Sequence, residues 1–166
     1  MKTAEFISKL EKSYSRYLSL YRQVLEASRE QKKLLSKIDS FADEEFDDLE
    51  DILEKKGQLF DRLEKVDQKL APYRNRLIED LELEEENWLI ELLEKDLKAE
   101  KLKQISKELA EVMDELNKIE QKNQQLVKDK QESLVKEINQ VKKSTKVNQS
   151  YSSKLRIHST YIDDKR

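Results

Sequence analysis

The chain has 166 residues, 42% of them charged, with one Gly, one Pro and no Cys. About half of it is Ala, Glu, Lys, Leu and Arg, a composition typical of long helices. The shortage of Gly and Pro excludes the tight turns of a β-sandwich or an α/β nucleotide fold, and the lack of Cys excludes disulfides, thiolate metal sites and Cys nucleophiles.

The net charge of −3 is unevenly distributed. Residues 43–100 carry 9 basic and 21 acidic groups, whereas the segments before and after them are net positive. A pI near 5.5 argues against general nucleic-acid binding. No apolar run approaches the roughly 18 residues of a membrane span, and the N-terminus has no signal-peptide pattern. We therefore expect a cytoplasmic protein without membrane insertion.

The first predicted helix covers residues 3–38. Apolar positions recur there with a 3-4 spacing that does not slip, as in one long amphipathic helix. At 1.5 Å per residue this helix is about 54 Å long. Its predicted apolar seam runs through Ile7, Leu10, Tyr14, Tyr17, Tyr21, Val24, Ser28, Gln31, Leu35 and Ile38.

Three tyrosines of this seam form an aromatic stripe, Tyr14, Tyr17 and Tyr21. With Arg16 and Arg22 nearby, such a stripe could stack nucleobases. Packing against the second helix is the favoured interpretation, because the tyrosines coincide with the seam. Whether the stripe is core or a contact surface stays open from the sequence alone.

The second predicted helix covers residues 41–80. Ser40 precedes an acidic first turn that suits the positive end of a helix dipole. Because the connection to the first helix is short, the two should be antiparallel neighbours. Pro72 is expected to kink this helix without ending it. The seam, with Lys56 as its one polar member, contains Leu49, Ile52, Lys56, Leu59, Leu63, Val66, Leu70, Tyr73 and Leu77.

A turn near Glu84 to Asn87 and a short helix over residues 88–97 are expected next, with Asn87 as N-cap. The last helix, residues 100–146, is predicted to be longer than its neighbours. Its last turns should then present an unpartnered apolar stripe to a protein partner. The predicted contact positions on it are Ile119, Asn123, Leu126, Val127, Leu134, Ile138 and Val141.

The C-terminal segment, residues 147–166, changes composition and is expected to be a flexible tail. It is either a terminus without a role or a segment that folds on a partner. The second interpretation rests on five apolar or aromatic anchors, Tyr151, Leu155, Ile157, Tyr161 and Ile162.

No motif in the sequence supports catalysis. The acidic runs at 43–51 and 82–86 lack the Gly and the alternating ligands of an EF-hand, and a solvated acidic face is favoured. The single His158 cannot supply a di-iron site or a catalytic triad. Phosphate-binding loops are excluded because they require several Gly residues and the chain has one. We therefore predict no enzyme activity, no cofactor and no metal.

Four segments in order carry a family resemblance: RYLSLYRQVLEASREQKKLL, LEDILEKKGQLFDRLEKVDQKLAPYR, WLIELL and ELNKIEQKNQQLVKDKQESLVKEI. The chain resembles flagellar export chaperones of the FlgN type over nearly its whole length. In that family the last helix shows an Asn, a nearby Leu and a later Ser-Leu pair, which here match Asn123, Leu126, Ser133 and Leu134. The ending YIDDKR is similar to that of some members.

The expected fold is all-α, an antiparallel helical bundle or coiled coil over residues 1–146 followed by the tail. The resemblance implies a cytoplasmic chaperone that binds hook-filament junction proteins and delivers them to the type III export gate, without binding nucleic acid. Free chains would be monomers or homodimers. The alternative from another class is a self-associating coiled-coil scaffold or tether, in which the long helix pairs with its own copy.

Overall fold

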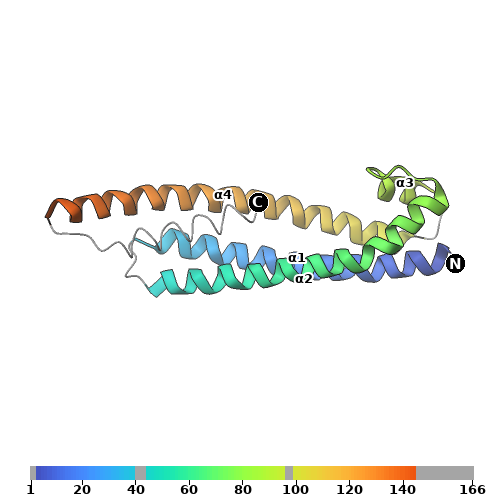
Figure 1. Ribbon diagram of the computed structural model, residues 1–166, viewed down its shortest axis with the longest axis horizontal. Helices are drawn as coiled ribbons and strands as arrows, with labels where there is room; N and C mark the ends of the chain where they lie inside the picture. Colours follow the sequence, from blue (N-terminus) through green and yellow to red (C-terminus); the bar gives the residue numbers. More distant parts are fainter. Residues whose placement is uncertain (1–2, 40–43, 96–98, 145–166) are drawn as a thin grey trace. The chain divides into compact units, whose positions relative to one another are not determined.

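A computed structural model describes residues 3–39, 44–95 and 99–144 of the chain, with side chains up to residue 140. Within these ranges it contains four helices and no strand (Figure 1). The prediction of an all-α fold with long helices is therefore confirmed. No helix in the described ranges combines the length and hydropathy that a membrane span requires.

The helices are α1 (Thr3–Lys37), α2 (Glu44–Leu81), α3 (Trp88–Glu94) and α4 (Glu100–Ser144). These bounds lie within a few residues of the predicted ones. The expected helix start at residues 40–43 and the whole tail, residues 147–166, lie outside the described residues.

The chain divides into two compact units. Unit 1 consists of Met1–Leu25 and Gly57–Glu115, and unit 2 of Glu26–Lys56 and Leu116–Arg166. Each of the three long helices therefore contributes one part to each unit. The two units also have different interiors.

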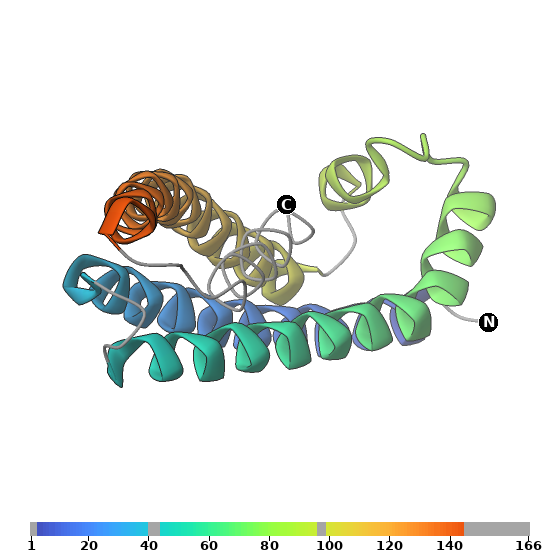
Figure 2. The same ribbon diagram turned by 60° about the vertical axis from the view of Figure 1, so that its left-hand side comes forward.

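In unit 1, the apolar seams of α1 and α2 pack together with α3 and the start of α4 (Figures 1 and 2). Leu10 near the start of α1 shares a core with Leu70 and Leu77 near the end of α2, so these helices are antiparallel. Leu102 of α4 joins the same core, and Arg22 forms an ion pair with Glu108 at 2.8 Å. Because residue numbers rise together along these two contacts, α4 runs parallel to α1.

Unit 2 has the same helix directions. Leu35 and Ile38 of α1 pack on Phe46, Leu49 and Leu53 of α2, which again makes the pair antiparallel. The predicted antiparallel arrangement of the first two helices is thus confirmed in each unit. Every predicted seam position of α2 is buried except Tyr73, which is half-buried.

The end of α2 is set by a left-handed residue, Glu82, with φ of 51°. The Leu83 amide donates to the Ile78 carbonyl at 3.0 Å and the Glu82 amide to the Glu79 carbonyl, the paired bonds of a Schellman motif. Leu83 is buried and packs in the same core as Ile78, which is the apolar contact that accompanies this motif. The chain therefore turns sharply into α3.

Asn87 precedes α3 as predicted, but its side chain forms no capping bond. The Asn87 amide group instead donates to the Glu84 carboxylate at 3.1 Å. The Glu91 carboxylate accepts from the Glu84 amide at 2.9 Å and ties the turn to the helix. Pro72 lies inside α2, which continues to Leu81 and changes direction in its last third (Figure 2). The expectation that Pro72 bends this helix without ending it is met.

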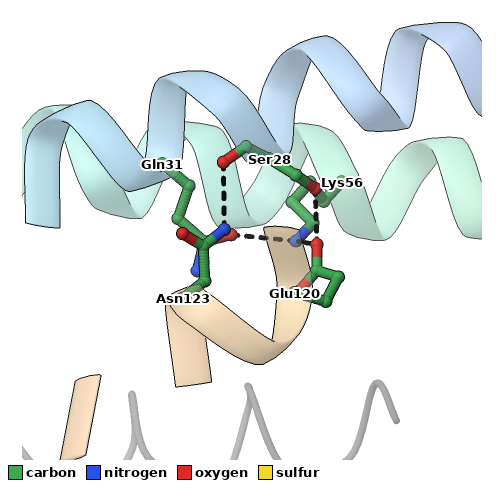
Figure 3. A network of polar contacts seen from close by, with 5 residues as sticks. All are labelled: Ser28, Gln31, Lys56, Glu120 and Asn123. Carbon is green, nitrogen blue, oxygen red and sulfur yellow. Dashed lines mark hydrogen bonds and ion pairs between the residues drawn. The ribbon is translucent and has the colours of Figure 1, made fainter. Parts of the chain in front are cut away.

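Unit 2 contains a buried polar network instead of a continuous apolar seam (Figure 3). Lys56 of α2, with 6% of its surface exposed, donates to the Gln31 amide oxygen at 2.8 Å and forms an ion pair with Glu120 of α4. Ser28 donates to the same Glu120 carboxylate. The Asn123 amide donates to the Ser28 carbonyl at 2.9 Å. Three helices are thus joined by polar bonds in one layer.

Replacing Lys56 by Ala should destabilise the protein, because Gln31 and Glu120 would lose the ammonium group that holds them. We expect the free energy of unfolding to fall by about 1 to 3 kcal/mol, the cost of leaving buried polar groups unsatisfied. Urea unfolding followed by circular dichroism measures this change. Lys55→Ala, the exposed neighbour on α2, is the matched control and should alter stability by less than about 0.5 kcal/mol. Equal losses in the two variants would contradict a stabilising role of the network.

Candidate functional site

The predicted contact residues on α4 fall into two groups in unit 2. Ile119, Leu126 and Val127 are half-buried, and the last two pack against the core of Leu35, Ile38 and their neighbours. The buried group is Asn123, Leu134 and Ile138. The side chain of Val141 and all five tail anchors, Tyr151, Leu155, Ile157, Tyr161 and Ile162, lie outside the described residues.

Asn123 has a structural role that the sequence did not indicate. Its side chain is fully buried and bonds to the Ser28 carbonyl of α1 within unit 2. Its amide oxygen has no hydrogen-bond partner among the described residues. Because a polar side chain at a seam position disfavours other alignments of the helices, Asn123 helps to set the register between α4 and α1.

Leu134 and Ile138 are covered in the free chain, with exposed fractions of 4% and 9%. The sequence predicts an exposed apolar stripe at these positions, whereas in the structure both side chains are buried. Val135, between them, is the exposed apolar residue, at 43%. A partner can therefore contact Leu134 and Ile138 only after these side chains have been uncovered.

Unit 1 contains an aromatic cleft that joins all four helices. It has a volume of about 440 Å³, and its walls include the three tyrosines of α1 and Trp88 at the start of α3. The Tyr14 ring meets the Trp88 ring edge to face, with centroids 6.4 Å apart. The cleft is lined by Tyr14, Tyr17, Tyr21, Leu63, Glu64, Asp67, Leu70, Arg74, Trp88, Leu109 and Met113.

The tyrosine stripe is thus neither pure core nor free surface: its rings are half-buried and form one wall of the cleft. The Tyr17 hydroxyl donates to the Asp67 carboxylate at 3.0 Å, and Arg74 lies 3.6 Å from the same carboxylate. The sequence predicts that the tyrosines pack on the α2 seam, which contains Leu63 and Leu70, but not that residues of α3 and α4 complete the cleft. The one sequence feature that pointed to α3 was Trp88, a large aromatic residue that follows a Glu-rich turn.

Burial raises the pKa of all three tyrosines. The pKa of Tyr14 rises to about 12, mainly because burial disfavours the phenolate, and Asp67 adds to the shift while Arg74 opposes it. The pKa of Tyr17 is also raised, first by burial and then by its hydrogen bond to Asp67. The cleft therefore presents neutral phenol rings throughout the physiological pH range.

Within the described ranges, no three or more His, Asp or Glu side chains are grouped as a metal site would require. The acidic run at residues 82–86 instead forms the turn before α3, where Glu84 bonds to Asn87 and Glu91.

The raised pKa of Tyr14 makes stability depend on alkaline pH. In the unfolded chain this phenol ionises near pH 10, whereas in the folded chain it stays neutral to about pH 12. The contribution to stability is therefore complete below pH 10 and is lost as the pH rises towards 12, by an amount on the order of 2 kcal/mol.

Tyr14→Phe keeps the ring and removes the titrating hydroxyl, so the free energy of unfolding of this variant should fall less steeply between pH 10 and pH 12. Urea unfolding at a series of pH values compares the two proteins. Parallel curves for the variant and the parent chain would show that Tyr14 is not shielded from water.

A comparison with protein-family models identifies related proteins. A family model described as FlgN protein matches residues 1–157 of the chain. Comparisons with the curated proteins and with the solved structures found no match. The match covers all four helices, and the FlgN proteins are flagellar export chaperones. This chain belongs to the FlgN family.

Proposed function

We propose that the chain is a cytoplasmic chaperone that binds the C-terminal helices of hook-filament junction proteins and delivers them to the type III export gate. The contact surface would be the second half of α4 together with the tail. The family match over residues 1–157 is the observation that carries this proposal. An amphipathic helix laid along another is a recurrent way of recognising such cargo.

The length of α4 supports the choice of this helix. In unit 2 it runs from Leu116 to Ser144, more than twice the length of the segments that α1 and α2 contribute. The ion pair of Lys130 with Asp39, at 3.6 Å, lies beyond the C-terminal end of α1. The part of α4 after Lys130 therefore extends past the end of α1.

The burial of Leu134 and Ile138 suits a chaperone that must release its cargo. Apolar side chains that are covered when no cargo is present do not offer a sticky surface. Cargo binding then exchanges one set of contacts for another, and the net affinity stays moderate because part of the interaction energy is spent on uncovering the helix.

The decisive variants are Leu134→Ala and Ile138→Ala. Each should weaken binding of a purified hook-filament junction protein by about 1 to 2 kcal/mol, or roughly 5- to 30-fold, because each removes a buried apolar anchor. Isothermal titration calorimetry measures the affinity, and circular dichroism shows the fraction of each variant that is folded.

Ile90→Ala is the matched control, since Ile90 is an exposed aliphatic residue of α3 in unit 1. It should leave the affinity unchanged. If the α4 variants bind as tightly as the parent, or if they unfold the free chain without a specific loss of affinity, the assignment of α4 fails. A free chain that elongates alone and takes up no cargo would favour the scaffold alternative.

The tail is tested by deleting residues 147–166. We expect the melting temperature to stay nearly unchanged while cargo capture or export falls. The five tail anchors could each contribute about 1.5 kcal/mol or more on burial, and the cost of ordering a Ser-rich segment would offset much of that. Secretion of hook-filament junction proteins from cells that carry the truncated chain is the measurement. Full export would show that the tail has no role in capture or delivery.

A further inference from the structure

Unit 1 contains a second concave surface, separate from the aromatic cleft. We call it the basic groove. It has a volume of about 300 Å³ and is bounded by α1 and α2 alone, with no α3 or α4 residue among the described residues that line it. Its lining residues are Lys12, Ser13, Arg16, Arg62, Lys65, Val66 and Lys69.

The groove and the cleft lie on different faces of α2. Glu64 and Asp67 of α2 line the aromatic cleft, which α3 and α4 help to enclose. Arg62, Lys65 and Lys69, only one or two positions away in the sequence, line the groove. These three cations of α2 thus lie on another face of the helix than Glu64 and Asp67, and no α3 or α4 residue borders them among the described residues that line the groove.

The five cations of the groove stand out because they gather on one concave surface. No ion pair or hydrogen bond joins their side chains to any described residue. Some other cations of unit 1 are paired, Lys9 with Glu5 and Arg76 with Asp80. Like charges one turn apart destabilise a helix, so this arrangement disfavours the free protein and an anionic partner would relieve it.

The spacing of the cations fits a helix better than other anionic partners. Lys12 and Arg16 on α1, and Lys65 and Lys69 on α2, are each four residues apart, which is a rise of about 6 Å. Carboxylates at positions i and i+4 of a partner helix have the same separation. Between the two rows lie Ser13 and the buried Val66, small side chains that allow a helix to approach closely.

Other polyanions fit less well. No aromatic ring is among the described residues that line the groove, so the stacking platform of single-stranded nucleic acid is missing there. A membrane or a duplex would extend past the groove and meet the exposed carboxylate of Asp61, one helical turn before Lys65. A narrow partner avoids those repulsive contacts.

We propose that the basic groove is a docking site for an acidic, amphipathic helix of a protein partner. The carboxylates of that helix would pair with the rows of Lys12 and Arg16 on one side and of Arg62, Lys65 and Lys69 on the other. This site lies in unit 1 and the α4 surface proposed for cargo lies in unit 2, so the two sites share no residue.

The probe for this proposal is a fluorescein-labelled amphipathic peptide of about 18 residues, long enough to form a helix, with Glu at successive i and i+4 positions. Fluorescence anisotropy with the full chain should show saturable binding that weakens as salt is added, since exposed charge pairs are screened. The same peptide with Gln in place of Glu should not bind.

The groove itself is tested by the double variant Arg62→Glu/Lys69→Glu, in which both residues are exposed. It should bind the acidic peptide at least about tenfold more weakly, because two attractions become repulsions. Lys101→Glu/Lys107→Glu changes the net charge equally on exposed positions of α4 and should bind like the parent. Circular dichroism of both variants checks that they are as helical as the parent chain.

Equal weakening in the two double variants would show non-specific attraction and overturn the proposal. Tighter binding of a single-stranded oligonucleotide or of phosphatidylglycerol vesicles than of the peptide would also overturn it. Sedimentation velocity tests whether the groove instead binds a second copy of the chain. If the free chain is a dimer and Arg62→Glu/Lys69→Glu makes it monomeric, the groove is a dimer interface and the proposal is wrong. The affinity of the groove variant for cargo should be unchanged, because the proposed cargo surface is on α4. The test of the groove is therefore independent of the proposed role of α4.

Discussion

A buried ammonium group constrains the alignment of three helices in unit 2. The charged side chain of Lys56 is stable in the interior only while Gln31 of α1 and Glu120 of α4 both accept hydrogen bonds from its ammonium group. Leu-rich seams alone permit helices to slide by whole heptads with little loss of buried area. A misaligned packing would leave Lys56 opposite an apolar side chain, which costs several kcal/mol. The network therefore selects one register, and Asn123 adds a second polar constraint.

Unit 1 reaches a unique arrangement by shape and turn geometry instead. The Schellman motif at Glu82 and Leu83 redirects the chain so that α3 reaches the core, where Leu92 is fully buried. Trp88 and the tyrosines of α1 then form the aromatic cleft, in which Tyr14 and Trp88 meet edge to face. The same three long helices thus use polar pairing in one unit and aromatic packing in the other.

For a chaperone of the FlgN family, surfaces of different chemistry suit different partners. The second half of α4 contains apolar side chains that are buried, so cargo recognition there, as proposed, would depend on exchange of buried contacts. The basic groove of α1 and α2 offers charge, which acts over longer distances and speeds encounter with an acidic partner. Separate surfaces would let a chaperone keep its cargo while it contacts another protein.

The sequence by itself determined the fold class and the helices, because heptad spacing, a shortage of Gly and the position of Pro72 act locally along the chain. It also identified Ser28, Gln31 and Lys56 as polar exceptions within apolar seams. Only the tertiary structure decided that these exceptions meet Glu120 and Asn123 in one layer, since register depends on how three helices align. It likewise decided that Leu134 and Ile138 are buried, and that the cations of α1 and α2 face each other across a groove. Side-chain periodicity gives the face of a single helix, whereas burial and charge clusters depend on which faces come together.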